Sequence, residues 1–134
     1  MAIFGLVEYD HAAPEVRAVY DDIMATRKTD WINNFWKGIA HDPALLKRTW
    51  EDTKQLMAPG ALDAVMKELI YIAVSITNGC PYCIAAHTVS ARKKGMTDDM
   101  FQEMMSVVGL ANANNRLANA YQIEVDEQFK TPLK

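Results

Sequence analysis

The stretch ELIYIAVSITNGCPYCIAAH, residues 68–87, decides the fold of this 134-residue chain. It carries no charged side chain between its first glutamate and its last histidine, yet Asn78, Gly79 and Pro81 interrupt it in the middle. Asparagine and glycine favour the left-handed conformation that ends a helix, and proline is favoured at the first position of the next helix. The stretch therefore predicts two apolar helices joined by a tight turn, which is a helical hairpin rather than a membrane span.

The sequence on either side of this hairpin predicts further helices and no sheet. No segment alternates apolar and polar residues with the period of two that a strand requires. Asp30, Asp42 and Thr97 are typical N-cap residues. We expect an all-α single domain over 1–134, with N-terminal helices at about 14–57, a core hairpin at about 62–95, a C-terminal helix at about 98–121 and a tail at 131–134. Within the N-terminal part, helices are expected at 15–27, 31–40 and 44–57.

The composition is that of an ordinary globular protein, with 50% apolar and 23% charged residues and a net charge of -3. No basic stripe is present, so nucleic acid is not expected as a partner. Residues 1–10 lack the pattern of a secretory signal, so we expect a cytoplasmic protein with no membrane partner. The helix expected at 62–77 is apolar nearly all round in its second half, which favours a homo-oligomer because a second subunit would cover it.

Three reactive side chains lie on one predicted helical face, because Cys80, Cys83 and His87 are spaced three and four residues apart. With Pro81 at the first helical position, Cys80 becomes the N-cap and Cys83 part of the first turn. The free N–H groups and the helix dipole favour a thiolate there, so we expect a thiol pKa below the usual value of ~8.5.

A proton relay can be predicted beside these thiols. His87, one turn after Cys83, can accept the thiol proton directly or through a water. An imidazole works better as a base when a carboxylate holds its second nitrogen. Glu68 is the candidate, because in an antiparallel hairpin it lies at about the same depth as His87.

The pair of thiols suggests a peroxide-reducing cycle. A thiolate attacks the O–O bond of a hydroperoxide and becomes a sulfenic acid, which a second thiol converts to a disulfide. An external reductant must then reopen that disulfide. We expect Cys83 to be the attacking thiol because it is closer to His87, and Cys80 to be the resolving thiol because the N-cap is more exposed.

The pattern of a glutamate, eleven residues and Cys-x-x-Cys-x-x-x-His resembles the AhpD-like alkylhydroperoxidase family, which includes the carboxymuconolactone decarboxylases. Residues 75–79, 94–95 and 112–119 also look similar, and the resemblance covers about 40–125. It implies a multihelical fold with the CxxC at the start of the second hairpin helix, and a homo-oligomer, a hexamer built as a trimer of dimers being favoured and a trimer possible. It also implies that Cys83 is peroxidatic, that Cys80 is resolving, and that Glu68 and His87 relay protons.

The resemblance has one departure. Well-known peroxidases of the family carry a second histidine where this chain has Tyr82, and a phenol, with a pKa near ~10, is a poor base at neutral pH. The expected partners are therefore a small-molecule hydroperoxide and a thiol or disulfide reductant of unknown identity, with no cofactor and no metal. The decarboxylase branch lacks the cysteine pair.

The same residues allow other interpretations. Cys80, Cys83, His87 and Glu68 supply four possible zinc ligands, but structural zinc usually joins separated loops. No βαβ pattern supports a thioredoxin-like site, and a c-type haem site would require a histidine directly after the second cysteine. Two rival functions stay open: a lyase that uses only the acid–base pair, and a redox-sensing oligomer without catalysis. Ser75 is expected either to bond its own helix backbone or to touch the site.

Overall fold

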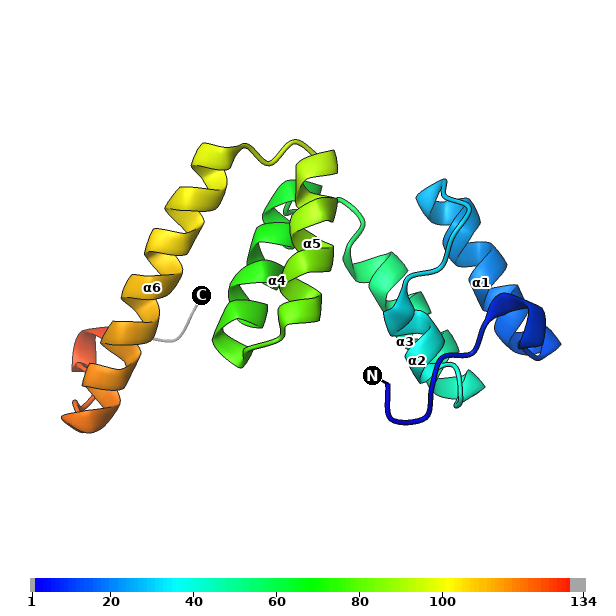
Figure 1. Cartoon of the computed structure of the whole chain (residues 1–134). Coiled ribbons are helices and arrows are strands. Elements are labelled where there is room, and N and C mark those ends of the chain that lie inside the picture. The colour runs from blue at the N-terminus through cyan, green and yellow to red at the C-terminus, as the bar shows by residue number, and fades with distance from the viewer. Residues whose placement is uncertain (1, 131–134) are drawn as a thin grey trace. The chain divides into compact units, whose positions relative to one another are not determined.

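The computed structural model describes residues 2–130, so the tail predicted at 131–134 lies outside the described residues. Within this range the chain forms six α-helices and two short 3-10 helices, with no strand (Figure 1). This confirms the predicted all-α class. The chain divides after Ala58 into two compact units, residues 1–58 and 59–134. The single domain expected over 1–134 stays a prediction.

The first unit contains a 3-10 helix (η1, Tyr9–His11) and three helices: α1 (Pro14–Arg27), α2 (Asn34–Ile39) and α3 (Pro43–Leu56). Both α1 and α2 pack on α3. The Asp42 side chain accepts a hydrogen bond from the backbone N–H of Leu45 and begins α3, as predicted. Burial of apolar side chains stabilises this unit. Its buried core residues are Ala12, Val16, Tyr20, Ile23, Ile32, Trp36, Ala40, Leu46 and Trp50.

The start of α2 differs from the prediction. We expected Asp30 to cap a helix over 31–40, but α2 begins only at Asn34, and residues 31–33 are not helical. Ile32 is buried in the core of this unit while Trp31 is 61% exposed. Burial of Ile32 in the core from a non-helical segment therefore outweighs the local capping signal of Asp30. The sequence alone could not reveal this burial.

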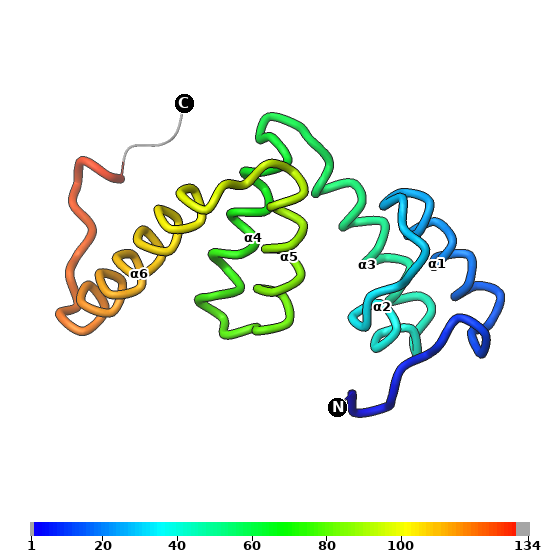
Figure 2. The backbone as a smooth tube through the Cα atoms, turned by 45° about the horizontal axis from the view of Figure 1, so that its top comes forward, coloured from blue at the N-terminus to red at the C-terminus, as the bar shows by residue number. Residues whose placement is uncertain are grey.

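The second unit contains α4 (Ala64–Asn78), α5 (Pro81–Lys93), α6 (Asp98–Ala120) and a 3-10 helix (η2, Glu127–Phe129). The helices α4 and α5 lie side by side as an antiparallel hairpin, and α6 packs on α4 (Figures 1 and 2). The helix boundaries agree with the sequence-based ones to within two residues at each end. At the start of α6, the Thr97 hydroxyl accepts a hydrogen bond from the backbone N–H of Met100, as predicted.

The turn of the hairpin follows from its sequence. Gly79 ends α4 in the left-handed conformation, with φ of +68°, which glycine adopts without steric cost. Cys80 then takes an extended conformation as the N-cap of α5, and Pro81 occupies the first helical position. The turn thus places both cysteines at the beginning of α5.

The core of the second unit is small. It consists of the buried Ile72, Ala91 and Met96 with partly buried neighbours. Other apolar side chains of this unit are exposed, including Ile70 and Val74 on α4 and Val107 and Leu110 on α6. Despite these apolar surfaces, no helix among residues 2–130 has the combination of length and hydropathy that crossing a membrane requires.

Candidate active site

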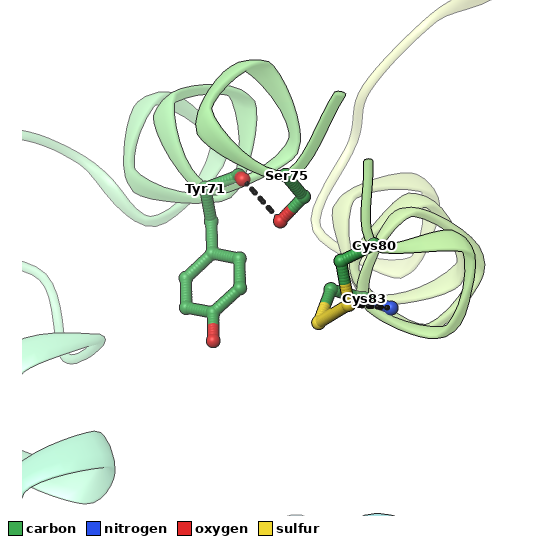
Figure 3. The surroundings of a disulfide bond; sticks show 4 residues. All are labelled: Tyr71, Ser75, Cys80 and Cys83. Atoms are coloured by element: carbon green, nitrogen blue, oxygen red, sulfur yellow. Dashed lines mark hydrogen bonds between the residues drawn. A yellow bond between two sulfur atoms is a disulfide. The ribbon is translucent and has the colours of Figure 1, made fainter. Parts of the chain in front are cut away.

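The two cysteines are joined by a disulfide at the first turn of α5, with their Cα atoms 5.4 Å apart. The backbone N–H of Cys83 also donates a hydrogen bond to Sγ of Cys80, at 3.3 Å. Figure 3 shows the sulfurs on the side of α5 near α4, where the ring of Tyr71 and the hydroxyl of Ser75 also lie. The structure thus holds the dithiol pair in its oxidised form at a helix N-terminus, a position that stabilises a thiolate once the bond is reduced.

Glu68 lies on the face of α4 that packs against α5, and its residue is only 2% exposed. Its oxygen Oε2 accepts a hydrogen bond from Nδ1 of His87, at 2.6 Å. The other oxygen, Oε1, accepts hydrogen bonds from the Ser90 hydroxyl at 2.7 Å and the Lys94 ammonium at 2.5 Å. All three donors lie on α5 or at its C-cap, so these hydrogen bonds connect Glu68 on α4 to the second helix of the hairpin.

These contacts decide the charge of Glu68. Burial alone would raise the pKa of this carboxyl group, because a low-dielectric surrounding disfavours the charged form. The hydrogen bonds donated by His87, Lys94 and Ser90 outweigh burial and lower the pKa of Glu68 to about 2. The carboxylate is therefore ionised at neutral pH.

The charge of Glu68 in turn fixes the tautomer of neutral His87. An ionised carboxylate can only accept hydrogen bonds, so Nδ1 of the imidazole carries the proton and Nε2 is the basic atom. The ring is also stacked on that of Tyr71, with centroids 3.6 Å apart and planes inclined by 20°. A carboxylate on one ring nitrogen and an aromatic ring on one face hold the imidazole in place.

The structure therefore brings the four predicted site residues together as two bonded pairs, Cys80 with Cys83 and Glu68 with His87. The antiparallel hairpin gives the acid and the imidazole the common depth expected from their distances to the turn. Ser75 is buried, and its hydroxyl donates to the backbone oxygen of Tyr71 at 2.8 Å, so its predicted bond to its own helix is confirmed.

Three further residues of the site were missed by the sequence interpretation: Tyr71, Ser90 and Lys94. A positional signal for two of them was present, because His87, Ser90 and Lys94 are spaced three and four apart and share one helical face. Tyr71 likewise follows Glu68 by three residues on α4. Spacing alone could not show which of the many residues on these faces reach the carboxylate or the imidazole.

The zinc interpretation can be compared with the same geometry. Among residues 2–130, no group of three or more His, Cys, Asp and Glu side chains is placed to hold a metal ion. The two sulfurs are bonded to each other, and Glu68 is occupied by three hydrogen-bond donors. The arrangement is that of a disulfide on the same helix as an imidazole that is hydrogen-bonded to a carboxylate.

Known proteins resemble this chain in both sequence and structure. The model of the carboxymuconolactone decarboxylase family matches residues 43–123. The crystal structure of an alkylhydroperoxidase AhpD core from Rhodospirillum rubrum is 53% identical in sequence and superposes with a TM-score of 0.86, covering 89% of this chain and 88% of that one.

Two curated relatives share shorter segments. An uncharacterized protein in the cox locus of Paracoccus denitrificans is 37% identical over 68 residues, which are 51% of this chain and 61% of that protein. The alkyl hydroperoxide reductase AhpD of Hyphomonas neptunium is 37% identical over 62 residues, 46% of this chain and 34% of that protein. The matched segments thus span less than two thirds of the length of either relative.

Proposed function

Because the chain belongs to the carboxymuconolactone decarboxylase family, and because its site pairs a dithiol with an acid–base couple, we propose that it is a thiol-dependent hydroperoxide reductase. The observation that carries this proposal is the Cys80–Cys83 disulfide at the N-terminus of α5, one helical turn before His87. The similarity to an alkylhydroperoxidase AhpD core adds support at the level of the reaction class.

In the first step Cys83 acts as the nucleophile. Nε2 of His87 takes the thiol proton, directly or through a water, while Glu68 stabilises the imidazolium that forms. The thiolate attacks one oxygen of the hydroperoxide, and the O–O bond breaks. Cys83 becomes a sulfenic acid, and the departing alkoxide takes a proton from His87 to leave as an alcohol, or as water when the substrate is hydrogen peroxide.

In the second step Cys80 resolves the sulfenic acid. Its sulfur attacks that of Cys83, a disulfide forms, and the hydroxyl group leaves as water. Only two residues separate the cysteines, so the sulfurs meet within one helical turn. An external dithiol then donates two electrons and two protons and restores both thiols.

Tyr82 stands between the two cysteines and is 42% exposed. It takes the place of the second histidine that well-known peroxidases of the family carry between their cysteines. His87 therefore transfers the proton, and Glu68 stabilises the imidazolium that forms.

The roles of the two thiols can be separated by substitution, with cumene hydroperoxide as substrate and dithiothreitol as reductant. Cys83→Ser is expected to lose essentially all peroxide consumption, because it removes the nucleophile. Reduced Cys80→Ser, tested without reductant, is expected to consume one equivalent of peroxide and to hold a sulfenic acid that dimedone traps at Cys83.

Unimpaired peroxide turnover by Cys83→Ser would overturn the assignment. The two rival functions predict other results in the same experiment. A lyase would convert a carboxylated lactone in both cysteine variants and lose that activity in His87→Gln. A redox sensor would form its disulfide once with peroxide and show no catalytic turnover when dithiothreitol is supplied.

A further inference from the structure

The side chains of His87, Ser90 and Lys94 form one row on α5 and its C-cap, and all three donate to the same carboxylate on α4. They divide its two oxygens between them: His87 has Oε2 to itself, while Ser90 and Lys94 share Oε1. Lys94 therefore does not contact the imidazole of His87. Its ammonium nitrogen nevertheless lies 2.5 Å from Oε1 of Glu68, the carboxylate that binds this imidazole.

The charge balance of this cluster gives the lysine its importance. A buried carboxylate requires a cation close by, because an unpaired charge in a low-dielectric interior is costly. Two groups beside Glu68 can supply that cation, an imidazolium at His87 or the ammonium of Lys94. If the imidazolium were the only partner, the carboxylate would hold a proton on the imidazole, and a protonated imidazole cannot accept one from a thiol.

We propose that Lys94 is a positioning residue of the site, whose ammonium supplies the permanent positive charge for Glu68 and so leaves His87 neutral and able to act as a base. The Ser90 hydroxyl supports the same oxygen without adding charge. The role of His87 as a base rests on the proposed peroxidase function. The charge balance among Glu68, His87 and Lys94 does not.

Among residues 2–130, the other groups next to this cluster lie on α4 and α5. From α4, Tyr71 stacks on the imidazole and Glu68 bonds to it. From α5, Cys83 lies one turn before His87, and in the oxidised form its sulfur does not titrate. Lys94 keeps a side-chain exposure of 34% while the carboxylate side chain keeps 3%, so the ammonium closes the cluster at its solvent side.

The test is an NMR titration of the histidine ring protons in the oxidised protein, from pH 5 to 9, with the His87 signal assigned from its loss in His87→Gln. In Lys94→Met the pKa of His87 is expected to rise by about one unit, because Glu68 then interacts with the imidazolium alone. Lys94→Arg restores the charge and is expected to bring the value back. If Lys94→Met does not fold, Lys94→Gln takes its place with the same expected shift.

Lys93→Met is the matched control, since it removes the same net charge from the neighbouring exposed position. Its His87 pKa is expected to equal that of the unmodified chain. A His87 pKa unchanged in Lys94→Met, or shifted equally in Lys93→Met, would overturn the proposal. No peroxide is used, so this result is independent of the cysteine experiment: failed peroxide turnover would leave a confirmed shift standing, and an unchanged pKa would leave the peroxidase assignment standing.

Discussion

At the scale of the residue, Glu68 sets the properties of the site. It is an ionised acid buried between α4 and α5, and its charge is compatible with burial because His87 donates to one carboxylate oxygen while Ser90 and Lys94 donate to the other. Removing one partner of such a cluster leaves the others buried and unsatisfied. The stability of the hairpin therefore depends on the ionisation of the Glu68 carboxylate.

This coupling predicts a pH dependence of stability. The pKa of Glu68 is lowered to about 2 in the folded chain, so its stabilising contribution is fully present above the unfolded-state value and is lost as the pH falls from about 4.5 towards 2. The unmodified chain should therefore gain stability relative to Glu68→Gln as the pH rises. The difference between their free energies of unfolding should be about 3 kcal/mol larger at pH 6 than at pH 2. Urea unfolding at a series of pH values measures the difference.

Glu124→Gln is the control for this measurement, because Glu124 is exposed and its substitution should give a small difference at every pH. A difference between the unmodified chain and Glu68→Gln that stays constant from pH 6 to pH 2 would contradict the interpretation of Glu68 as a strongly acidic group.

The sequence was informative about the residues whose spacing is constrained by their chemistry. Cys80, Cys83 and His87 could be placed together because they lie on one helix, and Glu68 because the turn fixes the register of the hairpin. Lys94 and Tyr71 could not be found this way. The role of Lys94 depends on how its flexible side chain reaches the carboxylate, and that of Tyr71 on which face of the imidazole its ring covers. Tertiary packing decides both.

At the scale of the element, the turn between α4 and α5 determines whether the two halves of the site meet. Gly79 holds a left-handed conformation in which an L side chain would be strained, although a Cβ there would meet no atom within 4 Å. The strain would therefore come from the backbone alone.

Gly79→Ala is expected to lower the free energy of unfolding by about 1 to 2 kcal/mol through this backbone strain. Gly109→Ala in the interior of α6 is the matched control, since a Cβ there also has open space around it. It should raise stability by about 0.5 to 1 kcal/mol, because alanine is the better helix former. Denaturant midpoints compare the two, and equal effects at both positions would contradict this account of the turn.

The element boundaries show where local signals suffice. Caps at Asp42 and Thr97 and the break at Gly79 act within a few residues, so the sequence alone located them. The start of α2 could not be located, because Ile32 is drawn into a core formed by residues far away in the chain. Capping and helix-breaking residues predict a helix boundary well only when no contact with distant residues competes with them.

At the scale of the whole molecule, the second unit leaves much apolar surface uncovered. Ile70 and Val74 on α4 are about half exposed, and Val107 and Leu110 on α6 are more than 60% exposed. Large apolar side chains exposed on one helix face, as Ile70 and Val74 are four residues apart on α4, are typical of protein–protein interfaces. The apolar second half of the helix expected at 62–77 predicts a homo-oligomer, and the family resemblance implies a hexamer or a trimer.

We therefore expect a homo-oligomer, a hexamer or a trimer, in light scattering coupled to size exclusion. Val74→Lys should lower the molar mass, because a charge in an apolar interface is costly to bury. Gln55→Lys adds the same charge at an exposed polar position of α3 and should leave the mass unchanged. A monomeric mass for the unmodified chain would contradict the prediction.

The disulfide at the head of α5 encloses only two intervening residues, and this has a thermodynamic consequence. A covalent bridge stabilises a protein mainly by restricting the unfolded chain, and the restriction grows with the length of the loop it closes. A ring this short restricts the unfolded chain less than a bridge that closes a long loop. Opening and closing the bridge should therefore change the folding equilibrium less than breaking a long-range disulfide would, so the proposed two-electron cycle can run while the hairpin stays folded.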